Sequence, residues 1–324
     1  MKSIAIIGAG ISALSLARQI QPYYHYQLFE KSATAGGRVA SRTLAEQTLD
    51  HGAQFFTARS PQFRQFMQEM TAAGHAADWQ ARFVEMEGAV ITSRRQWDEE
   101  YPHYVGMPDM AAIGRAMAQS QPILFNSEII ELNRQAKSWH LKDSEGHRYG
   151  PFDWVALTLP APQTLALLPT DFSAYKAIAD IPMKPCYALM LTLKADPAFA
   201  FQAALVKNAD ISWVSVNSSK PGREGHSLLV HATNKWARAH LDDDIESVKQ
   251  HMIKSVTAVT GLDPQLIEAA EVKRWRYANL PKQEQPAFYI DHELQLAACG
   301  DWCIKGRVEA AFTSGLKLGQ KLKL

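Results

Sequence analysis

The start of the chain constrains the fold most. An apolar run, Ile4–Ile7, leads into Gly8-Ala9-Gly10-Ile11-Ser12-Ala13, and a helical pattern and a second apolar run then end at Glu30. This order predicts a strand, a tight turn, a helix and a second strand that ends in an acid. Such a unit binds a dinucleotide: the first glycine permits the turn, the second lets the pyrophosphate approach the backbone, and Ala13 is small enough for close helix–strand packing.

The helix that follows this turn makes the turn attractive to phosphate. Its first backbone N–H groups have no partners within the helix, and its dipole places positive charge there. Glu30 is placed to accept both hydroxyls of an adenosine ribose. A signal peptide is the alternative, because Lys2 precedes an apolar stretch that reaches Ala17. The glycines and the acid favour the nucleotide site.

Composition restricts the class of protein. A length of 324 residues favours two domains. The formal net charge of +1 gives no electrostatic footprint for nucleic acid or an anionic membrane. The longest apolar candidate for a membrane span, 188–206, is interrupted by charges and a proline, so we expect a soluble, cytoplasmic protein. The three cysteines are too few for a disulfide framework or a zinc site, and no metal is expected: Cys186, Cys299 and Cys303.

A second phosphate-binding pattern lies near the C-terminus. Gly300-Asp301-Trp302 and the block 306–315, which opens with Gly306-Arg307-Val308-Glu309, predict a turn with an acid and a helix that starts at a glycine. Such a helix start can donate N–H groups to the pyrimidine oxygens of a flavin, and Asp301 can accept from the ribityl chain. An NAD domain usually completes its site in one stretch, so features at both ends favour FAD. The alternative is an aspartate cap on an ordinary terminal helix.

The rest of the pattern predicts two domains. Helices are expected at 61–70, 109–118, 242–259 and 307–318. Short β runs are expected at 123–125, 128–132, 139–141, 154–159, 187–193, 227–232 and 294–298, with a β excursion at 79–104. The runs between 123 and 159 resemble the small β meander inserted in many FAD-binding domains. We therefore expect an FAD-binding domain made of residues 1–73, 108–165 and 271–324, and a mixed α+β substrate domain made of 74–107 and 166–270.

Several motifs together resemble a known family. The N-terminal turn, Glu30-Lys31, Gly36-Gly37-Arg38 and the Gly300-Asp301 block resemble the flavin-containing amine oxidase superfamily. The blocks 50–59, 273–278 and 306–311 resemble its renalase branch. The resemblance covers the whole chain. It implies an α/β, p-hydroxybenzoate-hydroxylase-like architecture with a Rossmann-like FAD domain, FAD held without a covalent link, and oxidation of a small substrate with oxygen as the electron acceptor.

The resemblance also implies roles for particular residues. Glu30 would bind the adenosine ribose, Arg38 the pyrophosphate, and the segment His51–Phe55 would run beside the isoalloxazine. Ile129, taken as part of the second strand of the meander, would contact the adenine through its backbone. Val308 would donate its N–H to the flavin, and Asp301 would lie on the ribityl-phosphate side. The full set of expected cofactor residues is Gly8, Gly10, Ile11, Ser12, Ala13, Glu30, Lys31, Gly37, Arg38, His51, Gly52, Ala53, Gln54, Phe55, Ile129, Thr158, Asp301, Arg307, Val308 and Glu309.

Two features depart from the family pattern. Ala13 replaces the third glycine of the turn, and the sequence does not reveal the lysine that many amine oxidases hold near flavin N5. The second departure weakens an amine-oxidase assignment more than it weakens FAD binding.

Candidates for substrate contact are aromatic and polar residues that occur where the substrate domain is expected to meet or re-enter the FAD domain. Core packing is the alternative for each aromatic residue taken singly. His231 fits a substrate ligand and a core histidine equally well. The candidates are Trp213, His231, Asn234, Trp236, Trp275 and Tyr277.

The leading functional hypothesis follows from the resemblance. A renalase-like oxidase takes a hydride from dihydronicotinamide dinucleotide isomers, returns NAD(P)⁺ and reduces oxygen to hydrogen peroxide. An amine or polyamine oxidase is the alternative within the class, and it would need an acidic rim for a cation. A non-catalytic FAD-binding redox module is an alternative of another kind. No obligate protein partner is indicated.

Overall fold

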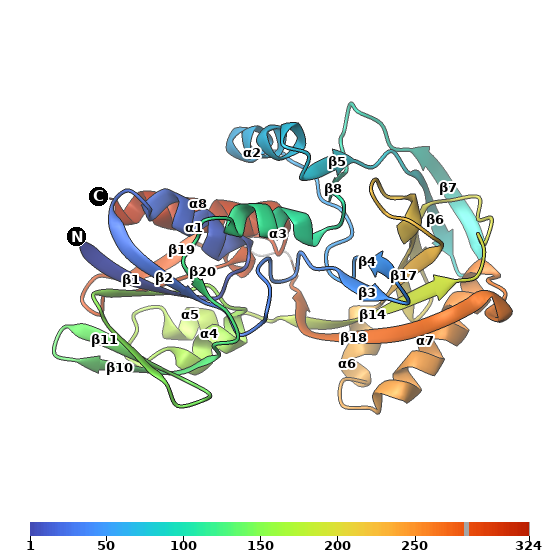
Figure 1. The fold of residues 1–324 in the computed structure, drawn as a ribbon. Helices are drawn as coiled ribbons and strands as arrows, with labels where there is room; N and C mark the ends of the chain where they lie inside the picture. The colour runs from blue at the N-terminus through green and yellow to red at the C-terminus, as the bar shows by residue number, and fades with distance from the viewer. Residues whose placement is uncertain (282–284, 324) are drawn as a thin grey trace. The chain divides into compact units, whose positions relative to one another are not determined.

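The computed structural model describes residues 1–281 and 285–323, and the chain divides into two compact units (Figure 1). The first unit contains residues 1–39, 114–183 and 280–324, of which 282–284 and 324, all assigned above to the FAD-binding domain, lie outside the described residues. The second unit contains residues 40–113 and 184–279.

The first unit is built around a six-stranded sheet in the order β19-β20-β13-β1-β2-β9. The strands β20, β13, β1, β2 and β9 are parallel, and β19 runs antiparallel at one edge. Its elements are β1 (Lys2–Ile7), α1 (Ile11–Ile20), β2 (Tyr24–Phe29), β9 (Ile123–Leu124), β13 (Trp154–Leu157), α4 (Ala161–Leu167), α5 (Tyr175–Ala179), β19 (Phe288–Asp291), β20 (Leu296–Cys299), the 3₁₀ turn η3 (Asp301–Cys303) and α8 (Val308–Leu322). The predicted α/β, Rossmann-like architecture is therefore confirmed.

The apolar run at the start of the chain forms β1 because both of its neighbours in the sheet are parallel strands. Ile4, Ala5 and Ile6 are fully buried, as expected for a strand that is covered on both faces. The turn after β1 and the helix α1 then carry the chain to β2, which pairs with β1 in register from Lys2 opposite Tyr24 to Ile7 opposite Phe29.

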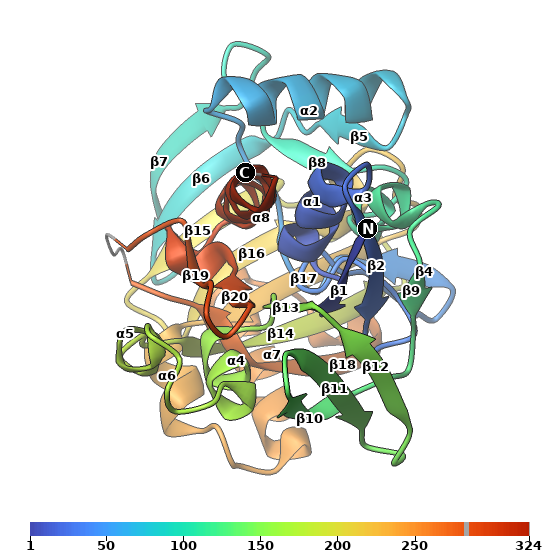
Figure 2. The ribbon, with the colours of Figure 1, turned by 90° about the vertical axis from the view of Figure 1, so that its left-hand side faces the viewer.

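Glycines let α8 lie directly against α1 (Figure 2). A Cβ added at Gly315 would come within 2.0 Å of the Ser12 carbonyl oxygen, and one at Gly319 within 2.4 Å of Gln19 Cβ. The Ser15 hydroxyl donates to the Phe312 carbonyl at 2.9 Å. Contacts advance in the same direction along both helices, so α1 and α8 run parallel and their N-termini lie at the same end of the unit.

The β meander differs in detail from the prediction. It is a three-stranded antiparallel sheet of β10 (Ile129–Gln135), β11 (Ser138–Asp143) and β12 (Arg148–Phe152). The run at 123–125 does not belong to it, because β9 pairs with β2 in the main sheet through Ile123 opposite Leu28. The placement of Ile129 on the second strand of the meander is therefore wrong: Ile129 opens the first strand. The sequence pattern also missed β12.

The second unit is built around a seven-stranded sheet in the order β18-β14-β17-β16-β15-β6-β7. Its elements are β3 (Arg42–Leu44), β4 (Gln47–Leu49), α2 (Pro61–Ala72), β5 (Ala76–Asp78), β6 (Arg82–Glu87), β7 (Val90–Gln96), β8 (Tyr104–Gly106), β14 (Lys184–Leu193), β15 (Ala203–Lys207), β16 (Ile211–Val216), η1 (Asn217–Ser219), β17 (Ser227–Ala232), α6 (Asn234–Ala239), α7 (Ile245–Thr260), η2 (Pro264–Leu266) and β18 (Ile267–Asn279). Helix α3 (Ala111–Ala118) contains the boundary between the units.

Side-chain alternation gives the seven-stranded sheet two different faces. One face carries Leu189, Val214 and Val230, which form an apolar core with Val248 and Met252 of α7. The neighbouring residues of the same strands point to the other face, since successive side chains in a strand alternate. That second face includes Trp213 of β16, His231 of β17 and Trp275 of β18, and Trp213 pairs with His231 in register.

The units differ from the expected domain boundaries. Segments 40–73, 108–113 and 271–279 group with the second unit, and 166–183 group with the first. Hydrogen bonding explains the placement of 271–279: β18 pairs with β14 from Ile267 to Asn279, so the chain returns to the first unit at Leu280 rather than at residue 271.

The contact between α1 and α8 gives a stability prediction. Gly315→Ala places a methyl group against backbone atoms that cannot move without separating the helices, so we expect the free energy of unfolding to fall by about 2–3 kcal/mol. Lys317→Ala, on the exposed face of α8, should change it by less than about 0.5 kcal/mol. Urea unfolding measures both variants. An unchanged midpoint for Gly315→Ala contradicts the close approach.

Candidate functional site

The predicted nucleotide-binding residues of the first unit gather at one edge of its sheet. Gly8, Glu30, Thr158 and Asp301 each follow the carboxyl end of a strand, namely β1, β2, β13 and β20. These strands are parallel neighbours, so their carboxyl ends meet at the same edge. In open α/β sheets, ligands bind at this edge.

The turn between β1 and α1 has the geometry that a pyrophosphate requires. Gly8 has φ of +105°, and a Cβ there would lie 2.7 Å from Thr158 Oγ1, so only glycine fits. A Cβ on Gly10 would meet nothing within 4 Å, which leaves open space beside the backbone. No side chain caps α1, so the first N–H groups of that helix remain available to a phosphate.

Glu30 braces this turn as well as facing the expected ribose. It is 8% exposed, and its Oε2 accepts from Ala9 N at 2.8 Å while its Oε1 accepts from Ser32 N at 2.9 Å. Each carboxylate oxygen has a second lone pair, so the group can still accept from ribose hydroxyls. The bracing role was not apparent from the sequence.

Arg38 and Asp301 form an ion pair within the first unit. The carboxylate of Asp301 is nearly buried, and its backbone carbonyl accepts from the amides of Ile304, Lys305 and Gly306. The pair joins the residue predicted for the pyrophosphate to the residue predicted for the ribityl side.

The start of α8 offers a second set of N–H groups. The helix begins at Val308 with Arg307 at the N-cap position, and no side chain caps it. Glu309 lies in the first turn, where its charge is favourable for the helix dipole. Because α1 and α8 are parallel, both uncapped N-termini face the same end of the unit. This arrangement suits a flavin dinucleotide, with its pyrophosphate at the start of α1 and its flavin at the start of α8.

The other predicted cofactor residues of this unit have ordinary surroundings. The Thr158 hydroxyl donates to the Ile7 carbonyl at 2.7 Å. Lys31 lies at the surface, 3.6 Å from Glu128. Gly37, with φ of +61°, approaches the Cα of Gly10, and Ile129 is buried.

Five of the predicted site residues meet on one face of the second unit. Trp275 Nε1 donates to the His51 carbonyl at 2.8 Å, and the two rings stack with centroids 5.4 Å apart. His231 interacts with the backbone of His51, which opposes the effect of burial on its pKa, and it pairs with Trp213 on the adjacent strand. Phe55, four residues after His51, lies 5.5 Å from Trp213, centroid to centroid.

Both histidines of this cluster are neutral. Burial, together with the charges of Arg42 and Lys273 and against the opposing effect of Asp50, lowers the pKa of His51 to about 4. Burial lowers the pKa of His231 to about 4 as well, with added effects from Lys220 and His51. A neutral imidazole can both donate and accept a hydrogen bond, and half-buried His231 keeps some accessible surface.

Two of the candidates lie elsewhere in the second unit. Trp236 belongs to the apolar core on the α7 side of the sheet, where it stacks on His240 and His251. Asn234 begins α6 and donates to the Pro185 carbonyl at 2.7 Å. The remaining candidate, Tyr277, is half-buried on β18, the strand of Trp275, two residues further along.

The sequence analysis missed a buried ionic cluster beside His51. Lys220 and Arg223 both bind the Asp50 carboxylate, and Lys220 also binds Gln54. The segment Ser219-Lys220-Pro221-Gly222 reads as a surface turn in the sequence, because its composition is typical of one. Only the long-range contact with Asp50 distinguishes Lys220 from an exposed lysine.

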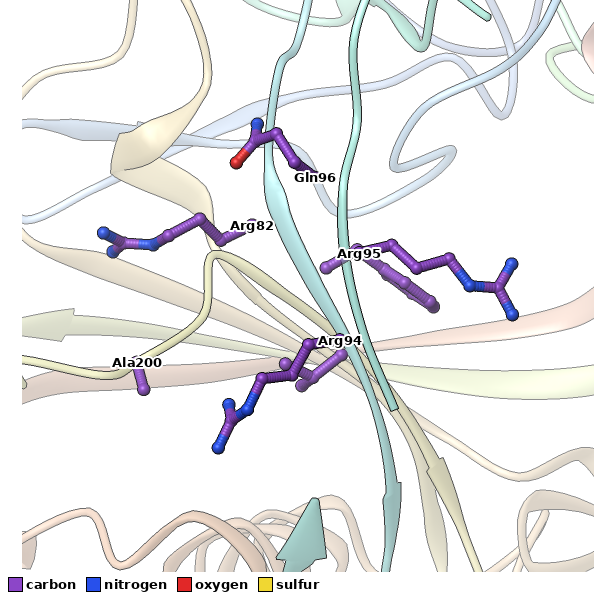
Figure 3. A pocket seen from close by; sticks show the side chains of 7 residues that line it. Arg82, Arg94, Arg95, Gln96 and Ala200 are labelled. Atoms are coloured by element: carbon purple, nitrogen blue, oxygen red, sulfur yellow. The ribbon is translucent and has the colours of Figure 1, made fainter. Parts of the chain in front are cut away.

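A surface hollow in the second unit involves none of the predicted site residues. It lies on the β6–β7 hairpin and the segment before β15, and Figure 3 shows Arg82 and Arg94 extending on one side of the hairpin and Arg95 on the other. Strand β7 is the edge of the sheet, and positive charge on an edge strand discourages pairing with another chain.

The comparisons with known proteins agree with this geometry. Residues 69–318 match the family of flavin containing amine oxidoreductases, and residues 6–70 match a NAD(P)-binding Rossmann-like domain. The chain therefore belongs to the flavin-containing amine oxidoreductase family, and it is an FAD-dependent oxidoreductase. Within the described residues, no helix is both long enough and apolar enough to cross a membrane.

Individual relatives cover the whole chain. Mouse (Mus musculus) renalase is 21% identical over 349 residues, which include 100% of this chain and 99% of the relative, so the predicted resemblance to the renalase branch is confirmed. A structure of reduced UDP-galactopyranose mutase has a TM-score of 0.76 at 14% identity, over 100% of this chain and 96% of that one. Wild-type putrescine oxidase bound to putrescine has a TM-score of 0.73 at 11% identity, over 99% of each chain. These structures support the fold.

The geometry of Glu30 gives a prediction for flavin retention. Glu30→Ala removes hydrogen bonds to the turn and to the expected ribose, each worth about 1.5–3 kcal/mol when charged. We expect the ratio of flavin to protein after dialysis, read from absorbance, to fall strongly. Glu145→Ala, at an exposed position of the same unit, should retain the ratio of the original protein. Full occupancy in Glu30→Ala contradicts the assigned role.

Proposed function

We propose that this protein is a renalase-like FAD-dependent oxidase of dihydronicotinamide dinucleotides. The substrate, 2- or 6-dihydro-NAD(P), gives up a hydride and leaves as NAD(P)⁺. The hydride and a proton are passed to oxygen, which becomes hydrogen peroxide. FAD, when bound, supplies the hydride acceptor.

The charge around His51 is the observation that carries the choice of substrate. Arg42 and Lys273 both impose positive charge on this imidazole. Asp50, the carboxylate that acts on this imidazole, is paired with Lys220 and Arg223, and Arg42 is paired with Glu271. Among the described groups around His51, a cationic amine would therefore meet net positive charge and no unpaired acid. A neutral dihydropyridine on an anionic dinucleotide suits this environment better.

In this proposal, the first unit provides the groups that bind FAD and the second provides the groups that bind the substrate. The turn Gly8–Ala13 and the start of α8 would hold the pyrophosphate and the flavin through backbone N–H groups, and Glu30 would hold the ribose. The aromatic walls of Trp213 and Trp275 would align a flat ring, and neutral His231 would hydrogen-bond its carboxamide. Positioning and exclusion of water are the main contributions the protein makes to hydride transfer. We propose that the first unit is the FAD-binding domain and that the second binds the substrate.

The manner of FAD attachment can be tested directly. No flavinylation motif is recognisable in the sequence, so we expect non-covalent FAD. Heat or acid should release the yellow colour into the supernatant as intact FAD, identified by chromatography. Colour that remains with the precipitated polypeptide contradicts non-covalent binding.

Anaerobic reduction of the flavin tests the substrate class. We expect rapid bleaching by 2- or 6-dihydro-NAD(P) and negligible bleaching by benzylamine, catecholamines or spermine, because the site repels cations. Ordinary 4-dihydro-NAD(P) serves as the control for the position of the hydride. Fast bleaching by an amine, with none by the isomers, overturns the proposal in favour of an amine oxidase. No bleaching by either set favours a non-catalytic redox module.

A further inference from the structure

The buried cluster around Asp50 carries a further inference. The side chains of Asp50, Lys220 and Arg223 are all fully inaccessible to solvent. Asp50 Oδ1 accepts from Ser41 Oγ and Met110 N, both at 2.9 Å. Asp50 Oδ2 accepts from Lys220 Nζ at 3.0 Å and from Arg223 Nη2 at 2.6 Å. Every lone-pair direction of this carboxylate is therefore used.

The cluster holds more positive than negative charge. Burial raises the pKa of Asp50, but Lys220 and Arg223 lower it more, so the carboxyl group is ionised. Arginine does not lose its proton in proteins, so Arg223 alone balances Asp50. The charge of Lys220 is then in excess inside the protein. An unbalanced buried charge is costly, so a cluster of this kind is poorly explained by stability alone.

Lys220 has a second contact that links it to the His51 segment. Gln54 Oε1 accepts from Lys220 Nζ at 3.1 Å and from Ser215 Oγ at 3.0 Å. These two donors fix the orientation of the amide, so Gln54 Nε2 faces the backbone carbonyls of Asp50, at 2.6 Å, and Gly52, at 3.1 Å. The side chain of Gln54 thereby closes the loop that contains His51.

The loop and the charge both act on the cluster of aromatic and imidazole rings. The loop sets the position of the His51 carbonyl, which Trp275 Nε1 binds at 2.8 Å. Independently, the positive charge of Lys220 contributes to lowering the pKa of His231, which favours the neutral imidazole. Two separate effects of one ammonium group therefore meet at the proposed substrate site.

We propose that Lys220 is a positioning residue for the substrate site: it fixes the loop of His51 through Gln54, and its ammonium group acts on the imidazole of His231. The inference rests on the proposed function, because it takes His51 and His231 as part of the substrate site. Lys220 acts through these residues and not on the substrate itself.

The ionisation of Lys220 supports this role. Burial lowers its pKa to about 8, with Arg223 adding to the effect and Asp50 opposing it. The charged groups identified as facing it are Asp50 and Arg223, and the titratable imidazole of His231 also faces it. Lys220 is thus charged at neutral pH and loses its proton as the pH rises through about 8, so kcat/KM for the dinucleotide should fall above that pH.

The decisive test is the pKa of His231, because it does not require turnover. In FAD-loaded protein labelled with ¹⁵N-histidine, NMR titration gives this pKa, and His231→Gln identifies the signal. We expect Lys220→Met to raise the pKa of His231 from about 4 by a measurable shift and Lys220→Arg to restore it. Lys207→Met removes a surface lysine that pairs with Glu85 and serves as the matched control. An unchanged pKa of His231 in folded Lys220→Met protein overturns the proposal.

Steady-state kinetics of the variants provide the second test. We expect Lys220→Met to raise KM for the dihydronicotinamide dinucleotide by about tenfold with flavin content unchanged, a size comparable to the loss of a group that orients a ligand at a metal site, and Gln54→Met to raise KM as well. The pH dependence near 8 should disappear in Lys220→Met. Wild-type KM in both variants overturns the positioning role. If Lys220→Met does not fold, Lys220→Gln keeps a donor without the charge and carries the same two measurements.

The two proposals fail in different ways. If no dihydronicotinamide isomer reduces the flavin of the unaltered protein, the proposed function fails, while the NMR titration still decides whether Lys220 controls His231. If the isomers reduce the flavin but the variants match the unaltered protein in both measurements, only the role of Lys220 fails.

Discussion

The parallel contact between α1 and α8 is the constraint on which the nucleotide site depends. Two helices from opposite ends of the chain approach closely because Gly315 and Gly319 offer no side chains at the interface. Their uncapped N-termini therefore lie at the same end of the first unit, beside the carboxyl edge of the parallel strands. Backbone N–H groups are the main binding resource of such a site, so the glycines of α8 matter for the cofactor although none is expected to touch it.

In the second unit, a single carboxylate has a comparable role. Asp50 ties the end of β4 to Lys220 and Arg223, and its amide donates to Asn217 Oδ1 at 3.2 Å. The segment that follows, residues 51–53, is thereby held at one end by Asp50 and at the other by Gln54. The rings of His51 and Trp275 can stack only because this loop has a defined conformation.

The sequence predicted best those features that depend on residues close together in the chain. The turn Gly8–Ala13 and Glu30 belong to one βαβ unit, so their spacing determines their geometry. Asp50 and Lys220 are 170 residues apart, and nothing in either segment signals their contact. The same reason explains two errors. Residues 123–125 were assigned to the meander and residues 271–279 to the FAD-binding domain. The partner of each strand lies far away in the sequence, namely Leu28 for β9 and Tyr187 for β18. The sequence could not separate Trp236 from Trp213 and Trp275. Trp236 packs in the core on the α7 side of the sheet, whereas the other two lie on the opposite face, and the sequence does not show on which side a residue lies.

The bonds from Glu30 to Ala9 and Ser32 have a consequence for how the protein acquires its cofactor. A glycine turn without such support would sample many conformations, and a ligand would have to select one of them. Here the carboxylate already holds the turn in shape, so the entropy of ordering it is lost when the chain folds and not when the dinucleotide arrives. The bonds of Glu30 therefore lower the entropic cost of binding a dinucleotide at this turn.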